Sequence, residues 1–306
     1  MARLYDMVVA PGLCSLPALM GGEYSAAIME PSALRRLGRT MMQSTVIIAD
    51  NVAEYFFDGS DKEVWQPEDF PAALPPLSPV FLEFRAPSFV TSEVGGRFPW
   101  HRPERAWGWL VETRAREPAG WTVLYTLFVD QRGTPGAGIM GPMLQFDVDV
   151  DERGALPPRS NLRAWRCASA VPASDPRALD FYASAEPLLD PVHLTFSFMH
   201  CKNIKQREVV PPAILRQPWK KKHGRPLVRY RVLDIDPMRK VLKSEGRSDE
   251  VGLKKALHIC RGHFATYTED APLFGRVTGT FWKPQHVRGS AKHGAVVKDY
   301  RVGAPA

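Results

Sequence analysis

Two strand-like segments decide the fold expected of this chain: Ala106-Trp-Gly-Trp-Leu-Val-Glu-Thr-Arg114 and Trp121-Thr-Val-Leu-Tyr-Thr-Leu-Phe-Val-Asp130. Similar segments precede and follow them, at Val80–Phe84 and Met143–Val150. Turns rich in proline, glycine and charge separate the four segments, and that succession is typical of an antiparallel sheet.

Helices are expected on both sides of this pattern in the sequence. Residues 31–57 predict one helix, because a Pro-Ser pair can begin it and apolar residues recur at helical spacing. Asp175 is expected to cap a second helix over residues 176–189. The pair Asp236-Pro237 is expected to begin a short third helix that ends near residue 243.

The C-terminal third is expected to be rich in strands. Val192–Met199 alternates and is apolar, which predicts a buried strand. Residues 205–225 are basic and rich in proline, and they predict an extended arm or mobile loop. Further strands are expected at Leu227–Ile235, Leu257–Thr266, Thr278–Lys283 and Val296–Val302.

These patterns predict an α+β protein with two regions. Residues 1–190 form an acidic region with a helix and an antiparallel sheet, and residues 191–306 form a basic, histidine-rich and β-rich module. The net charge is +7, but residues 200–301 hold 23 Lys and Arg against 9 Asp and Glu, which is +14 there and −7 elsewhere. Such a basic region attracts polyanions, most commonly nucleic acid. The alternative is a solvated lysine surface that keeps the protein in solution.

The cysteines indicate the compartment. Cys14, Cys167, Cys201 and Cys260 are far apart and form no CxxC pair, so a disulfide framework is not expected and a reducing cytoplasm is. The apolar N-terminal segment is interrupted by Asp6, too early for a signal-peptide core. No apolar run approaches the ~20 residues of a membrane-spanning helix, and no membrane partner is expected.

Two motifs favour structural interpretations. Gly136-Ala-Gly-Ile-Met-Gly141 matches the dinucleotide-binding GxGxxG, but a strand pattern follows where the cofactor would require a helix. Asp147, Asp149 and Asp151 share one face of a strand, where carboxylates could hold Mg²⁺. The simpler interpretation is the wet face of an amphipathic strand.

Histidine is concentrated in the basic module, which holds seven of the eight. Histidine titrates near neutrality and suits general acid–base work, and RNA can be cleaved without metal by two histidines and a cation. The candidate acid and base are His263 and His258, with His286 as the next candidate, and Arg261 and Arg288 are the candidate cations that stabilise the phosphorane.

Zinc binding and a structural role are the alternatives for the same segment. His258, Cys260 and His263, with Cys201, are residue types that bind zinc, although an adjacent His200-Cys201 pair has poor spacing. The cysteines could equally be small core residues, with the histidines as hydrogen-bonded strand positions.

The arm is the candidate nucleic-acid-binding element. Trp219 lies among basic residues and is the best candidate for stacking on a base, while the cations would hold phosphates. These cations are Lys220, Lys221, Lys222 and Arg225. A solvated loop is the alternative.

The C-terminal third resembles a family of uncharacterised bacterial and prophage-associated proteins. The resemblance rests on Ser197-Phe-Met-His-Cys-Lys-Asn203, Leu257-His-Ile-Cys-Arg-Gly-His-Phe264, Gly279-Thr-Phe-Trp282 and His286-Val-Arg-Gly289. It implies a mobile-element or defence setting, and it carries no activity, cofactor or catalytic residue.

Three hypotheses follow. The first is a metal-independent, toxin-like endoribonuclease that prefers RNA to DNA and needs no cofactor. The second is a non-catalytic DNA- or RNA-binding module, stabilised by zinc or not. The third is a structural protein of a mobile element whose basic half docks on an acidic protein partner. The sequence indicates no oligomeric state.

Overall fold

The chain divides into two units, which are described separately. Unit 1 comprises residues 1–200 and 205–234, and unit 2 comprises residues 201–204 and 235–306. The basic module expected at 191–306 is thereby distributed over both units. The computed structural model describes residues 3–10, 31–58, 70–86, 105–130, 139–140, 144–156, 163–166, 186–235, 256–260, 262–283, 286–288 and 290–295.

Unit 1 is built on a mixed sheet with the strand order β7-β6-β4-β3-β2-β1-β9-β8, and β5 pairs with β4. The strands are β1 (Thr45–Ile48), β2 (Val80–Ala86), β3 (Arg105–Ala115), β4 (Trp121–Asp130), β5 (Ile139–Met140), β6 (Leu144–Val150), β7 (Arg163–Arg166), β8 (Lys205–Val209) and β9 (Tyr230–Asp234). The predicted α+β class is confirmed, and β2, β3, β4 and β6 pair antiparallel as expected. Strand β1 is parallel to both β2 and β9, which makes the sheet mixed.

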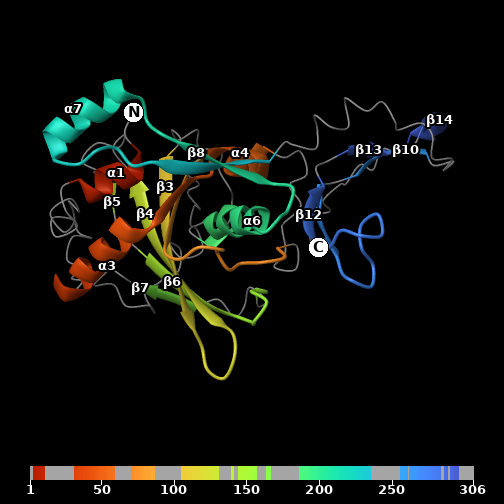
Figure 1. Cartoon of the computed structure of the whole chain (residues 1–306), viewed down its shortest axis with the longest axis horizontal. Helices are drawn as coiled ribbons and strands as arrows, with labels where there is room; N and C mark the ends of the chain where they lie inside the picture. The colour runs from red at the N-terminus through yellow and green to blue at the C-terminus, as the bar shows by residue number, and fades with distance from the viewer. Residues whose placement is uncertain are drawn as a thin grey trace, which may run out of the picture. The chain divides into compact units, whose positions relative to one another are not determined.

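Helices cover both faces of this sheet, as Figure 1 shows. Helices α1 (Leu4–Val9) and α3 (Pro31–Gln43) lie on one side, where Leu4, Met41 and Phe81 belong to one buried cluster. Helix α6 (Asp190–Met199) lies on the other side, and its buried His193 shares a hydrogen bond of 3.1 Å with the Tyr125 hydroxyl of β4. The sheet is therefore the middle layer of unit 1.

The prediction of a single helix over residues 31–57 is wrong. Helix α3 ends at Gln43, strand β1 follows, and α4 (Asp50–Asp58) begins two residues after it. The segment Thr45-Val-Ile-Ile48 is β-branched throughout, and its last three residues are buried. A short apolar run fits a buried strand as well as a buried helix, so the helical spacing of the flanks misassigned it.

The prediction of a strand at Val192–Met199 is also wrong, because this segment is helix α6. Every residue from Asp190 to Phe198 is buried. A helix that is buried on all sides shows no amphipathic pattern, and its apolar run resembles that of a buried strand. The signal that favoured a helix was Pro191 in the first turn, a position that suits proline.

The segment predicted as an extended arm is folded. Residues 205–209 form edge strand β8, paired with β9, and α7 (Ala213–His223) follows. Pro218 lies inside α7, and Gly224 ends the helix in the left-handed conformation (φ 71°). Proline has no backbone N–H, so the carbonyl four residues before Pro218 lacks its usual helical donor. Because α7 buries none of its residues, that carbonyl can accept a hydrogen bond from water instead.

Unit 2 contains short strands in two separate sheets. One is a hairpin of β11 (His263–Tyr267) and β12 (Gly279–Lys283), and the other has the order β13-β10-β14. Its strands are β10 (Ala256–Cys260), β13 (His286–Arg288) and β14 (Ser290–Ala295). The strand expected over Leu257–Thr266 is thus two strands in different sheets. The predicted strand at 296–302 and helix at 236–243 lie outside the described residues, as does the helix at 176–189 except for a 3₁₀ turn at Glu186–Leu189.

None of the helices in the described part of the chain combines the length and apolar character that crossing a membrane requires.

Candidate functional site

A basic surface, here called the basic edge, lies along the β8 end of the sheet in unit 1. It consists of exposed side chains from β8, from α7 and from the segment leading to β9. These are Lys205, Arg207, Lys220, Lys221, Lys222, Arg225 and Arg229. The last turn of α7 supplies three of them. Cations at the C-terminal end of a helix interact favourably with the helix dipole and so stabilise the helix.

Few acidic residues lie in the segment that carries the basic edge. Residues 205–234 contain nine Lys and Arg but only Glu208 and Asp234 as acids. Glu208 pairs with Arg229 at 3.3 Å, but their side chains are 53% and 68% exposed. Exposed ion pairs of this kind contribute little and compete poorly with a phosphate. The cationic surface is therefore directed at solvent.

Trp219 anchors α7 to unit 1. Its ring is partly buried, packs against the cluster of α1, α3 and the sheet, and lies 4.1 Å from the ring of His223. A ring that packs in this way is less available to a base than the sequence suggested. The lysines of the same helix remain exposed.

Unit 2 holds the predicted acid–base residues on two pairs of strands. In the register of β10 and β13, His258 pairs with Arg288 and Cys260 pairs with His286. His263 lies on β11, where it is exposed and pairs with Lys283 of β12. Arg261 lies outside the described residues. Three of the five predicted residues therefore lie on adjacent strands, with His263 in the neighbouring hairpin along the chain.

The zinc hypothesis gains no support from Cys201. Its side chain is 4% exposed, and burial raises the pKa of the thiol to about 12. Among the side chains that the structure describes, no three from His, Cys, Asp and Glu gather as a metal site.

The acidic strand β6 fits its simpler interpretation. Val148 and Val150 are buried, while Asp149 accepts a hydrogen bond from the Thr122 hydroxyl at 2.7 Å and faces Arg116 at 3.4 Å. Asp151 accepts backbone N–H bonds from two residues of the following turn. The carboxylates of Asp149 and Asp151 thus stabilise the sheet and its turn.

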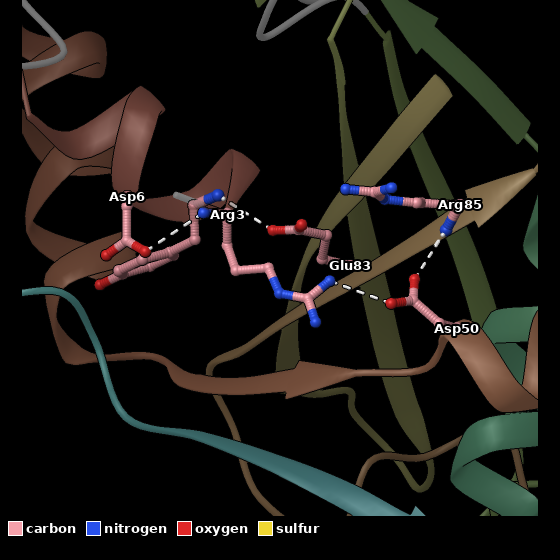
Figure 2. Close-up of polar contacts among 6 residues, drawn as sticks. Arg3, Asp6, Asp50, Glu83 and Arg85 are labelled. Atoms are coloured by element: carbon pink, nitrogen blue, oxygen red, sulfur yellow. Dashed lines mark hydrogen bonds and ion pairs between the residues drawn. The ribbon is translucent and has the colours of Figure 1, made fainter. Parts of the chain in front are cut away.

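Sequence reasoning missed a polar cluster in unit 1, here called the α1 clamp, which consists of Arg3, Tyr5, Asp6, Asp50 and Glu83. Figure 2 labels four of these residues, all except Tyr5. Glu83 lies in the middle of β2 and is only 2% exposed. Its carboxylate accepts the backbone N–H of Tyr5 at 3.1 Å. Burial raises the pKa of Glu83 to about 7, although backbone N–H donors and Arg3 oppose the effect.

The other members of the clamp make three further contacts that fix the position of α1. Arg3 pairs with Asp50 at 2.9 Å, and Asp50 also accepts the backbone N–H of Arg85 at 3.0 Å. Asp6 accepts the backbone N–H of Val228 at 2.9 Å, and burial raises its pKa. The Tyr5 hydroxyl donates to the carbonyl of Met41 at 2.9 Å. Helix α1 is thereby tied to β2, α3, α4 and the segment before β9.

Close approach of α1 requires a glycine opposite Glu83. Gly108 of β3 pairs with Glu83, and a Cβ atom there would lie 2.6 Å from Cζ of Phe81 and 3.0 Å from Cδ2 of Leu4. A carboxyl with a raised pKa beside an arginine has the chemistry of an acid–base site. Here it binds the backbone of α1, so the clamp is assigned a structural role. The signal in the sequence was a single acid inside the apolar segment Val80–Phe84.

Comparisons of the chain with protein-family models, with curated proteins and with solved structures find no match.

Proposed function

We propose that the protein binds nucleic acid and that the basic edge holds its phosphates. The observation that carries this proposal is the set of seven exposed Lys and Arg side chains on β8, α7 and the approach to β9, with two acids in the same segment. Cations that neutralise phosphates release counterions, and this term supplies most of non-specific binding. A cytoplasmic location, as expected from the cysteines, belongs to this proposal.

The folded state of the segment strengthens the argument over that for a mobile arm. Helix α7 is held by Trp219 against the core of unit 1, and β8 is paired along its length with β9. The cations on these elements therefore lose less conformational freedom on binding than those of a disordered arm would. Preorganised cations favour a phosphate backbone of defined spacing.

The test is the salt dependence of binding. The affinity for a labelled 16-base-pair RNA duplex, and for the DNA duplex of the same sequence, is measured by fluorescence anisotropy between 50 and 300 mM salt. Replacing Lys220, Lys221 and Lys222 by Gln is expected to weaken binding to both duplexes and to reduce the slope of log K against log salt by about 2–3. Glutamine is used because it also favours a helix.

A matched control comes from α3, which presents the exposed side chains of Arg35, Arg36 and Arg39. Replacing these three by Gln removes the same charge from another helix and is expected to change the slope by less than 1. Binding without salt dependence, or equal loss in the two triple variants, would show that the basic edge is not the site.

A second candidate function is metal-independent cleavage of RNA in unit 2. The observation that favours it is the register of β10 with β13, which puts His258, His286 and Arg288 on adjacent strands. One histidine would take the proton of a 2′-hydroxyl, whose oxygen attacks phosphorus. The other histidine would protonate the departing 5′-oxygen, leaving a 2′,3′-cyclic phosphate and a 5′-hydroxyl. His263 and Arg261 remain in this proposal as a further acid–base group and cation, and cleavage would suit a toxin- or defence-like protein.

The cleavage test uses RNA in EDTA, with DNA of the same sequence as the control, because DNA lacks the 2′-hydroxyl. Cleavage of RNA alone, lost in His258→Ala and His286→Ala while RNA binding is retained, is the expected result. Cleavage of DNA, or cleavage that requires added Mg²⁺, would contradict the mechanism. His193→Gln is not a suitable control, because His193 is buried in the core of unit 1.

A further inference from the structure

The β11–β12 hairpin of unit 2 has two faces of different character. Phe264 and Trp282 pair across the strands, their rings are 4.8 Å apart, and Trp282 is 2% exposed. Side chains alternate along a strand, so the residues next to these two point to the opposite face. That second face holds Tyr267, Phe281, Lys283 and His263, none of which is buried.

Two rings, a lysine and a histidine are adjacent on the second face. The rings of Tyr267 and Phe281 are 5.9 Å apart and nearly perpendicular, and both side chains are only partly buried. The Lys283 ammonium lies 5.2 Å from the centre of the Tyr267 ring. His263 is exposed at the position paired with Lys283. Aromatic faces beside cations are the arrangement that holds unpaired nucleic-acid bases and their phosphates.

Residues 202 and 203 hold the hairpin in a fixed geometry. Asn203 forms two hydrogen bonds with the backbone of Trp282, donating to its carbonyl at 2.7 Å and accepting its N–H at 2.9 Å. The backbone N–H of Lys202 donates to the carbonyl of Thr280 at 3.0 Å. The Lys202 ammonium lies 3.2 Å from where a Cβ on Gly279 would be, and Gly279 pairs with Tyr267. A second lysine therefore lies close to these rings.

The loop that joins the two strands presents a further aromatic ring. Phe274 is 86% exposed and has a φ of 53°, a conformation that is costly for a bulky residue. Backbone bonds between Leu273 and Val277, at 2.7 and 3.0 Å, hold the turn around it. Phe274 packs little of its ring and strains its backbone, so folding does not account for a phenylalanine there. Strained, exposed loop residues are typical of binding sites.

We propose that this hairpin binds single-stranded nucleic acid. Tyr267, Phe281 and Phe274 stack on unpaired bases, while Lys202, Lys283 and His263 meet the phosphates. Unit 2 as a whole carries 14 Lys and Arg against 7 Asp and Glu, which suits a polyanionic ligand. The exposed acids of the loop, Glu269 and Asp270, repel phosphates, so the loop is assigned to bases and the strands to the backbone.

Lys283 takes two positions in this proposal. Without ligand its ammonium covers the Tyr267 ring, and an exposed contact of this type is weaker than stacking of a base. A base therefore displaces the ammonium, which remains on its flexible stem within reach of the neighbouring phosphate. This site belongs to unit 2, whereas the basic edge belongs to unit 1 and holds phosphates without regard to whether the bases are paired.

The test compares two polyanions on the full chain. A labelled 12-nucleotide oligo-uridine, and its oligo-deoxythymidine equivalent, present bases and phosphates, whereas inorganic polyphosphate presents phosphates alone. Phe274→Asn removes a ring at a position where Asn tolerates the backbone conformation. This variant is expected to bind both oligonucleotides about tenfold more weakly and to bind polyphosphate within twofold of the unsubstituted chain. Tyr267→Leu is expected to behave in the same way, and Tyr267→Phe to restore binding.

The matched control is Trp121→Leu, which changes an exposed ring on β4 of unit 1 and is expected to leave both affinities unchanged. The proposal is overturned if Phe274→Asn and Tyr267→Leu bind oligonucleotides like the unsubstituted chain, or if polyphosphate binding falls equally. Failure of the basic edge gives a different result, because the triple Gln variant of α7 would then retain its affinity for polyphosphate.

Discussion

The buried carboxyl of Glu83 makes the stability of unit 1 depend on pH in a predictable direction. Its pKa rises from the ordinary 4.5 to about 7 in the folded chain because burial disfavours the charged form. The stability that this group contributes is therefore complete below pH 4.5 and is lost as the pH rises through 7. Each pKa unit corresponds to about 1.4 kcal/mol, so the loss amounts to about 3 kcal/mol between pH 4.5 and 8.

The substitution Glu83→Gln isolates this effect. The amide keeps an oxygen that can accept the backbone N–H of Tyr5, and it cannot ionise. The variant is expected to exceed the free energy of unfolding of the unsubstituted chain by about 1 kcal/mol at pH 5 and by about 3 kcal/mol at pH 8. Burial also raises the pKa of Asp6, but that contribution is common to both proteins and cancels in the difference.

Urea denaturation at pH 5, 6, 7 and 8, at constant ionic strength, measures the difference directly. Glu112→Gln is the matched control, because Glu112 lies on the neighbouring strand β3 and is partly exposed. Two parallel pH profiles for the Glu83→Gln variant and the unsubstituted chain would refute the reasoning. A variant that is destabilised equally at every pH also gives parallel profiles and has the same meaning, namely that the ionisation of Glu83 does not affect stability over this range.

Two further substitutions test packing inside unit 1, and a labelling experiment tests the burial of Cys201 in unit 2. Tyr5→Phe removes the buried hydrogen bond to the Met41 carbonyl and is expected to cost about 1 kcal/mol in urea denaturation, whereas an unchanged midpoint would argue against that bond. Gly108→Ala places a Cβ 2.6 Å from the fully buried Phe81 ring and is expected to destabilise unit 1 by about 1–3 kcal/mol; a neutral result would mean that α1 can move away from the sheet. Cys201, with its thiol pKa raised to about 12, is expected to resist iodoacetamide at pH 8 in the folded chain and to react after denaturation, as mass spectrometry of the labelled peptide would show; rapid labelling of the native protein would contradict its burial.

Strands β2, β3, β4 and β6 of the sheet in unit 1 were predictable because turns bound them clearly and their residues are typical of strands. Strands β3 and β4 combine aromatic and β-branched residues and are bounded by clear turns, so the sequence alone identified them. Strand β1 and helix α6 were misassigned because both are buried on all sides. In that environment the apolar residues need no periodicity, and a strand cannot be told from a helix.

The candidate sites show the same division between local and distant information. Counting charges identified the basic segment 205–225, but proline content suggested an arm where the structure has a strand and a helix. The α1 clamp could not be found in this way, because the contact from Tyr5 to Glu83 spans 78 residues. Nothing near either residue in the sequence reports that contact. The face of the β11–β12 hairpin needed the strand register, which pairs Tyr267 with Gly279 and His263 with Lys283.

The clamp also has a consequence for the order in which the protein assembles during synthesis. Asp6 of α1 binds the backbone of Val228, 222 residues later in the chain. At roughly 5–20 residues per second, a ribosome needs on the order of 10–45 seconds to make the intervening segment. Throughout that interval the apolar residues of α1 lack part of their final surroundings, since Trp219 and Val228 complete the same cluster. Unit 1 therefore closes late, and in this interval nascent chains depend most on protection from aggregation.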